Sequence, residues 1–291
     1  MTSSATNATE AHVALARRAW GRMEAIHTLH YFAPAVHAAH QQLGLDDVRM
    51  SYVASRSAPM GTVGPELVLA TFYGFAPGFV AAAVPEAWNR ASPAQVLEAS
   101  LQALGATLAE HLADVHDEVV RAAELARELA ILHPILARPL AAAWSSVPIA
   151  DDPHVALWQA VTIIRESRGD GHLACLLDAE LDGTQVHLLA RGDSPKLRQI
   201  LGAMRGWSDA EWDVAVSRLQ DRGLLDGDGV PTAAGRALHE RIERRTDELA
   251  APPWAAFGAS GEQLLDTLEP IVTPLTASGI LPGVVVRAAT A

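Results

Sequence analysis

The sequence predicts a mainly α-helical protein with an N-terminal helical domain and a second helical domain that carries a small β-wing. Apolar residues recur at helical spacing along most of the chain, and only two short segments have an extended or hairpin-like pattern. Hydrophobic residues make up 49% of the sequence and aromatic residues 5%, which indicates cores of Ala, Leu and Val. The 291 residues are enough for two ordinary domains.

The N-terminal half is expected to contain a flexible tail over 1–10 and a helical domain over 11–150. The first helical pattern should bend at Pro34, because proline lacks an amide hydrogen and its ring clashes with the preceding turn. Ser92 followed by Pro93 is typical of a helix start. Several prolines then interrupt residues 134–153, so we place a domain boundary near residue 150.

The second domain is expected over 151–250, followed by a helical extension over 251–291. Its first helix, 154–167, should stop at the glycines of 169–171 and resume over 172–181. The remaining elements are, in order, a strand at 185–190, helices at 194–204 and 208–222, a hairpin-like turn at 224–232 and a helix at 233–249. This order of elements is that of a winged helix.

A sequence resemblance supports that interpretation. Residues 215–250 read AVSRLQDRGLLDGDGVPTAAGRALHERIERRTDELA, with a GLL step at the end of one helix, a wing, and Pro231-Thr232 before the next helix. The segment resembles regulators of the multiple-antibiotic-resistance (MarR) type, which have Leu-Thr at the last of these positions. The resemblance implies a winged-helix fold in which the helix at 208–222 would read DNA.

The charge of the chain disfavours DNA as a partner without excluding it. With 22 basic and 34 acidic residues, the net charge is −12, so no general attraction to phosphate polymers is expected. Asp209, Glu211 and Asp213 begin the helix that would enter the groove, while Arg218 and Arg222 lie at its far end. A single carboxylate could accept from cytosine, but three at the start of the helix make direct base reading by it unfavourable. The alternative reason for their presence is that the first turn of any helix favours acids.

The chain is expected to be cytoplasmic. Cys175 is the sole cysteine, which excludes an intramolecular disulfide and a cysteine-rich zinc site and fits a reducing compartment. The first ten residues lack the cationic start and apolar run of a secretory signal. No uncharged, proline-free apolar stretch reaches about 18 residues, so no membrane partner is expected.

A first polar site is predicted on the N-terminal helix. Glu24, His27 and Tyr31 are three and four residues apart, so they share one helical stripe with Trp20. That stripe should be buried. The Glu–His pair is interpreted as a hydrogen bond in the core, as a ligand contact, or as half of a metal site of the Glu-x-x-His kind found in di-iron bundles.

A second polar site is predicted where the helix after residue 153 should break. Its polar residues are Arg165, Glu166, Arg168, Asp170 and His172, with Trp158 on the same face. The first amides of the resumed helix, together with an arginine, would hold an anionic ligand, and His172 would exchange a proton. In the alternative interpretation the site is a structural corner, with Asp170 as a cap and Arg168 paired with Glu166.

A wider resemblance covers nearly the whole chain. It rests on segments such as EAIHTLHYFAPAV at 24–36, YVASRSAPMGTVGPE at 52–66 and LWQAVTIIRESRGDGH at 157–172. These are similar to an uncharacterised actinobacterial family of helix-turn-helix proteins. The resemblance implies that both polar sites and the Tyr52, Arg56 and Pro59 segment belong to one assembly.

Two functions follow from these observations. The first is a small-molecule-binding winged-helix protein, a homodimer that acts as a transcription regulator with a degenerate DNA-reading helix. Its expected ligand, anionic in nature, would contact Tyr31, Tyr52, Arg56, Trp158, Arg165, Arg168 and Asp170. The second is an enzyme that uses Glu24, His27, Glu166 and His172 as catalytic groups, with Glu24, His27 and His172 as the candidate metal ligands. The sequence identifies no cofactor.

Overall fold

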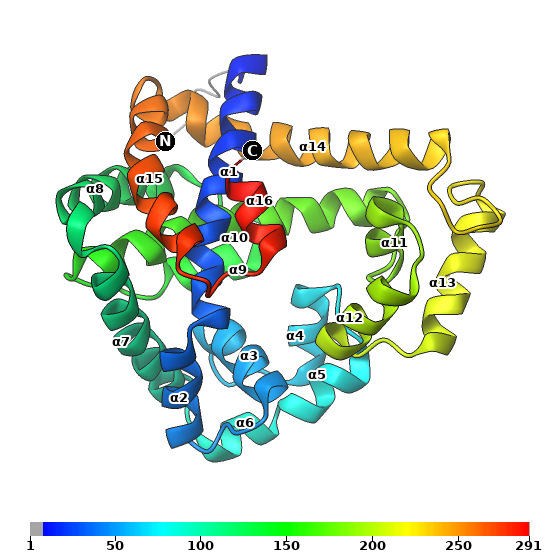
Figure 1. The fold of residues 1–291 in the computed structure, drawn as a ribbon, viewed down its shortest axis with the longest axis horizontal. Coiled ribbons are helices and arrows are strands. Elements are labelled where there is room, and N and C mark those ends of the chain that lie inside the picture. The colour runs from blue at the N-terminus through cyan, green and yellow to red at the C-terminus, as the bar shows by residue number, and fades with distance from the viewer. Residues whose placement is uncertain (1–7, 291) are drawn as a thin grey trace.

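The computed structural model describes residues 8–290, and Figure 1 shows that helices make up almost all of it. The helices of the first half are α1 (Glu10–Phe32), α2 (Pro34–Gln42), α3 (Val48–Ser57), α4 (Pro65–Phe72), α5 (Pro77–Ala83), α6 (Glu86–Arg90), α7 (Pro93–His111), α8 (His116–Leu132) and α9 (Pro139–Ser145), with single 3-10 turns at Ala58–Met60 and Ala113–Val115. Those of the second half are α10 (Pro153–Asp178), α11 (Gln185–Arg191), α12 (Pro195–Arg205), α13 (Asp209–Asp221), α14 (Ala233–Phe257), α15 (Ser260–Ala277) and α16 (Gly283–Ala289). None of these helices is both long enough and apolar enough to cross a membrane.

Proline marks the start of many helices. Proline stands in the first turn of α2, α4, α5, α7, α9, α10 and α12, where its missing amide costs no helical hydrogen bond. The predicted bend at Pro34 is confirmed as the junction of α1 and α2. Ser92 caps α7 by accepting from the Gln95 amide at 3.3 Å. Most of the tail expected over 1–10 lies outside the described residues.

The two predicted β elements are wrong. Residues 185–190 belong to α11, whose Leu188 and Leu189 are buried in the core of the second half. At the position of the wing, Leu225 and Pro231 form one isolated bridge, and residues 8–290 contain no strand. The Asp226 carboxylate accepts from the amide of Val230 at 2.9 Å, so a tight turn takes the place of a hairpin ladder.

The predicted break at 169–171 is also wrong, because α10 continues through both glycines. Asp170 does not cap a new helix; its carboxylate accepts from the amides of Leu140 and Ala141, at 3.1 Å each, and so caps α9. Gly171 lies against Arg138, and a Cβ there would be 2.6 Å from the guanidinium. These residues therefore serve close packing of α9 on α10 rather than a stop.

α10 lies at the centre of the molecule. Its first half, including the fully buried Trp158, joins the large core formed with α1, α8 and α15. Its last turns contribute Cys175 and Leu176 to the core of α11–α14. A third core lies among α3 to α7. The domain boundary near residue 150 stays a prediction. The helix that follows it, α10, packs both in the large core with α1, α8 and α15 and in the core of α11–α14.

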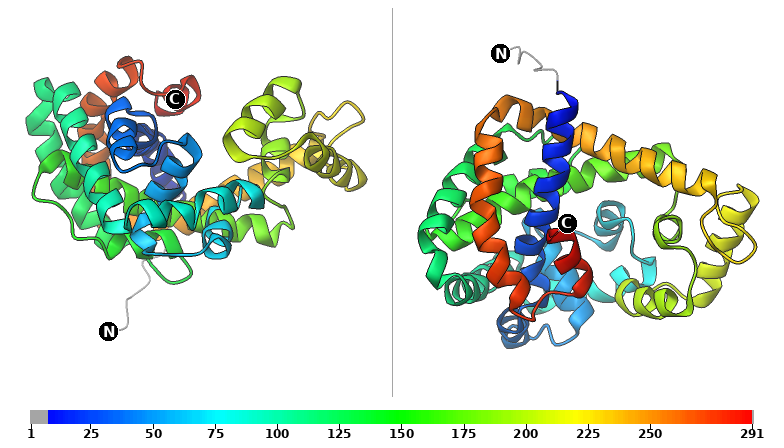
Figure 2. Two further views of the ribbon diagram at one scale, coloured as in Figure 1. Left: turned by 90° about the horizontal axis from the view of Figure 1, so that it is seen from below. Right: turned by 45° about the horizontal axis from the view of Figure 1, so that its top comes forward.

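The unit formed by α11, α12, α13 and the start of α14 projects to one side of the molecule (Figure 2). α10 and α14 pack along each other and carry this unit at their far ends. The unit also contacts the body through the end of α12, where the Ala76 amide donates to the Arg205 carbonyl at 2.8 Å. The position of the α11–α14 unit thus depends on contacts at two separate places.

The start of α14 gives a stability prediction. Gly235 lies so close to the Leu224 carbonyl that a Cβ would overlap it, whereas a Cβ at Gly227 would meet nothing within 4 Å. We expect Gly235→Ala to lower the free energy of unfolding by about 1–3 kcal/mol, because the backbone must shift to make room. Urea unfolding measures the effect, with Gly227→Ala as the control. Equal effects of the two substitutions would contradict the packing described.

Candidate functional site

The first predicted polar site lies where α1 crosses α10. The Trp158 indole donates to the His27 carbonyl at 3.1 Å, and the two rings stack with centroids 6.0 Å apart. His27 Nδ1 is 3.0 Å from the Thr162 hydroxyl. These contacts are buried and hold the His27 ring in one orientation. Glu24, His27 and Tyr31 share one stripe of α1, as their spacing predicts, and His27 on that stripe faces α10.

A network of charges joins α1, α3 and α10 at this crossing, and we call it the arginine–glutamate cluster: Glu24, Arg56, Arg165 and Glu166. Arg165 donates to Glu24 Oε2 at 3.1 Å and to Glu166 Oε2 at 3.0 Å. Arg56 donates to the same Glu166 oxygen at 3.4 Å. The structure therefore brings together residues of both predicted polar sites with the predicted Arg56.

Several polar atoms of this cluster and of the adjoining His27 are buried without a hydrogen-bond partner. They are Glu166 Oε1, His27 Nε2 and Arg56 Nε. Glu166 Oε1 and His27 Nε2 are 3.7 Å apart, too far for a direct hydrogen bond. An unpaired buried polar atom costs free energy, so a further polar group that reached this place would be favoured.

Burial and charge set the protonation of the cluster. Burial lowers the pKa of His27 to about 4, and the Arg165 charge acts in the same direction, so the ring is neutral near pH 7. Burial acts to raise the pKa of Glu166, but Arg165 and Arg56 outweigh it and hold this pKa at about 2. The site thus presents an ionised carboxylate beside a neutral imidazole.

Aromatic rings pack beside the cluster. Tyr31 and Tyr52 pack with centroids 4.8 Å apart, and Tyr52 meets Phe75 at 5.5 Å. The Arg56 guanidinium lies over the Phe72 ring at 4.4 Å. Burial raises the pKa of Tyr31 well above its ordinary value, so its hydroxyl stays a donor. Tyr31 and Tyr52 therefore lie near Arg56, and their role as ligand contacts stays a prediction.

Arg205 is a member of this site that the sequence analysis missed. It ends α12, and its guanidinium lies 4.1 Å from the Phe75 ring centroid. Within residues 8–290 it forms no ion pair. Burial lowers the pKa of Arg205, and the charges of Arg56 and Arg165 lower it further. An arginine in the last turn of a helix is ordinary in sequence, so no local signal pointed to it.

Arg168 and His172 belong to a second cluster, apart from Glu24 and His27. Arg168 donates to Asp247 of α14 at 2.8 Å and stacks on Trp20 at 4.6 Å. His172 Nδ1 is 2.9 Å from the Thr246 hydroxyl. Their side chains contact α14, and the expectation that they share a pocket with Glu24 and His27 stays a prediction.

The candidate metal ligands do not form a set of donors. Glu24 pairs with Arg165, whereas His172 faces Thr246 and Glu243 in the second cluster. In the part of the chain that the structure describes, no group of three His, Cys, Asp or Glu side chains is arranged to hold a metal ion.

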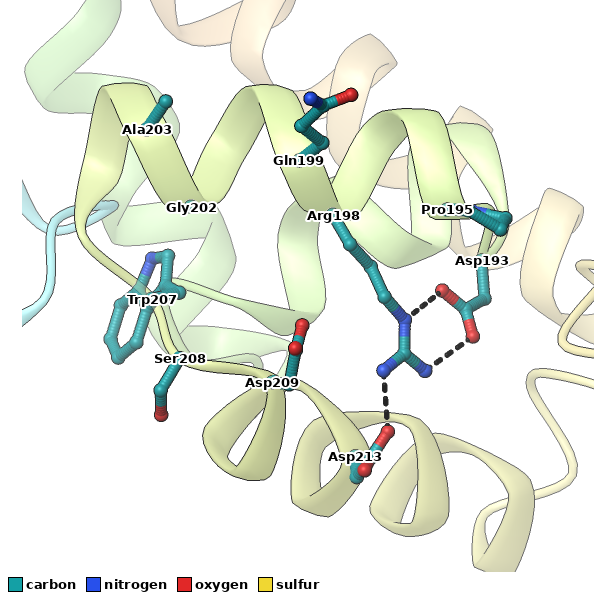
Figure 3. A pocket seen from close by; sticks show the side chains of 10 residues that line it. All are labelled: Asp193, Pro195, Arg198, Gln199, Gly202, Ala203, Trp207, Ser208, Asp209 and Asp213. Atoms are coloured by element: carbon teal, nitrogen blue, oxygen red, sulfur yellow. Dashed lines mark hydrogen bonds and ion pairs between the residues drawn. The ribbon is translucent and has the colours of Figure 1, made fainter.

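An open groove of about 940 Å³ lies between α12 and α13, the helix that was predicted to read DNA (Figure 3). Arg198 crosses it and is bound to Asp193 at 2.7 Å and to Asp213 at 2.5 Å. Asp209 also lines the groove, so its one arginine is neutralised by the acids around it. Glu211 is part of a capping box with Ser208, which explains its position by helix capping.

The buried His27 gives a prediction about pH. Because its folded pKa is about 4 and the unfolded ring has a pKa near 6.5, the unfolded state binds the extra proton between these values. Stability is then fully present above about pH 6.5 and falls on acidification, with a share from His27 of about 2 kcal/mol by pH 4.5. Urea unfolding across this range should show a shallower loss for His27→Asn than for the wild type. Parallel curves would show that His27 is not buried neutral.

Comparison with known proteins adds one finding. Residues 16–282 match a helix-turn-helix family. No curated protein and no solved structure matches the chain. The match covers nearly all of the chain and includes α1, α3, α10 and α12, which build the site described above, as well as α13. The chain therefore belongs to this helix-turn-helix family.

Proposed function

We propose that this protein is a ligand-responsive transcription regulator that binds an anionic small molecule at the arginine–glutamate cluster. One observation carries the proposal: Arg56 and Arg165 pair with the two carboxylates of Glu24 and Glu166, while Arg205, on the nearby Phe75 ring, has no ion-pair partner among the described residues. One positive charge is left over beside buried atoms without partners. A carboxylate or phosphate group would balance that charge and accept from the free donors.

The other groups around the cluster fit an organic ligand. Tyr31 and Tyr52 would contribute hydroxyl donors and ring surface. Trp158 holds His27 in place beside the cluster by a hydrogen bond to the His27 carbonyl. Arg168 and Asp170, which were expected to contact the ligand, are engaged with α14 and α9 and leave the proposal. The ligand is thereby confined to α1, α3, α10 and the end of α12.

Family membership makes DNA the first partner to test, and the MarR-like resemblance of residues 215–250 supports a regulator. We expect a homodimer in the cytoplasm, as in regulators of that type. The acids of α13 argue for weak base reading. The alternative, an enzyme using Glu24, His27, Glu166 and His172, has less support, because both carboxylates are bound to arginine and His172 lies in the other cluster.

Anion binding tests the ligand site. We expect inorganic phosphate or acetate, titrated at constant ionic strength, to raise the unfolding temperature of the wild type, since a ligand of the folded state stabilises it. Arg56→Gln should weaken binding about tenfold, because a charge-assisted hydrogen bond is lost. Arg127→Gln, which removes an exposed arginine of α8, is the control. Identical titrations for the two variants would contradict the site.

DNA binding tests the helix-turn-helix. We expect a mobility-shift assay with the DNA upstream of the protein's own gene to show weak binding that Asp209→Asn with Asp213→Asn strengthens, because two negative charges are removed and Arg198 keeps only Asp193 as a carboxylate partner. The gain should shrink as salt is raised. Asp151→Asn, at an exposed site before α10, is the control. No gain from the double variant would show that α13 does not approach phosphate.

A further inference from the structure

Arg205 lies between the arginine–glutamate cluster and the turn that connects α12 with α13. It is the last residue of α12, and the turn to α13 follows it directly. Its guanidinium rests on Phe75 at 4.1 Å from the ring centroid, and among the described residues no carboxylate pairs with it. Arg205 is half-buried, so without a carboxylate partner its charge is only partly solvated, and an anion beside it would be favoured.

The chain at 205–207 packs against residues 74–79. The Arg205 carbonyl accepts from the Ala76 amide at 2.8 Å, and the Trp207 indole donates to the Gly74 carbonyl at 3.1 Å. Gly206 has φ +81°, and a Cβ there would lie 2.6 Å from Phe79. The turn of the helix-turn-helix therefore fits closely against this segment.

Residues 72–79, which include this segment, also contribute the aromatic rings beside the arginine–glutamate cluster. Phe75 contacts Tyr52, and its neighbour Phe72 lies beneath the Arg56 guanidinium. The two phenylalanine rings are 5.8 Å apart, so Arg56 and Arg205 rest on adjacent rings of one wall. A group bound between these two arginines would touch the body of the protein and α12 at once.

Charge makes this contact sensitive to occupancy. Arg56 has Glu166 as a partner at 3.4 Å, but Arg205 has only the ring beneath it. Besides burial, the Arg56 charge acts to lower the pKa of Arg205, so the two guanidinium groups repel each other, and an oxyanion that reached both would replace this repulsion by two attractions. The contact of the end of α12 with residues 74–79 should therefore be weaker without a bound anion and stronger with one.

We propose that Arg205 senses the ligand: a carboxylate or phosphate group bound beside Arg56 recruits Arg205 and thereby fixes α12, and with it the helix-turn-helix, on residues 72–79. The inference rests on the proposed anion site and adds to it the route by which binding reaches α13. The other attachment of the unit, through α14, is already held by full ion pairs, so the end of α12 is the place where a ligand changes the balance.

Hydrogen–deuterium exchange of the full chain tests the proposal. Inorganic phosphate and acetate serve as separate probes at constant ionic strength, which distinguishes a tetrahedral from a planar oxyanion. In the wild type we expect the probe to slow amide exchange in 195–205 and 74–79. Arg205→Gln should bind the probe about tenfold more weakly and, at saturation, show no slowing in 195–205. Lys196→Gln, an exposed cation on the same helix, should behave as the wild type.

The outcomes separate this inference from the ligand site itself. If Arg205→Gln keeps the full slowing at saturating probe, the sensing role of Arg205 is refuted while anion binding stands. If Lys196→Gln loses the slowing as well, the effect is one of general charge and the inference is likewise refuted. If neither probe binds the wild type by calorimetry, the anion site fails and the inference fails with it. Circular dichroism of each variant verifies that the helices are intact.

Discussion

The buried carboxylate of Glu166 is the constraint around which the body of this protein is arranged. A charge with 1% of its side chain exposed is stable only with close partners. Arg165 from α10 and Arg56 from α3 supply them, and Arg165 reaches on to Glu24 of α1. Three helices are thereby required to meet at one place, and the stacking of His27 on Trp158 fills the space beside them.

The same helix, α10, organises the other half of the molecule through a second set of ion pairs. Arg168, one turn beyond Arg165, binds Asp247 and Glu243 of α14, and Arg17 of α1 binds the same two acids. Here each charge has its partners, and Trp20 lies against both arginines. The first cluster has unpaired buried atoms and the second has its charges paired, which distinguishes the proposed ligand site from a structural joint.

This difference gives a physical account of how a member of a helix-turn-helix family would respond to a small molecule. The α11–α14 unit is held by the complete joint at α14 and by the contact of α12 with residues 74–79 (Figures 1 and 2). Only the second contact includes a cation without a counter-charge. The acids that line the groove between α12 and α13 neutralise Arg198, so this groove is not a positively charged surface.

Much of the secondary structure and part of the site follow from short-range patterns in the chain. Ser92 before Pro93, and Ser208 three residues before Glu211, specify helix starts through capping that acts within one turn. The spacing of Glu24, His27 and Tyr31 places them on one stripe for the same reason. The glycines beside Asp170 misled the prediction because their role depends on α9, about thirty residues away along the chain.

Tertiary packing decided the membership of the site. Arg165 and Arg168 are three residues apart, yet one binds Glu24, 141 residues away, and the other binds Asp247, 79 residues away in the opposite direction. Arg205 has no local feature that distinguishes it from any arginine at a helix end. Local propensity extends over about one turn of helix, whereas burial of charge is balanced by whichever partners the folded chain brings within a few ångströms, and no pattern of neighbours in the sequence specifies those.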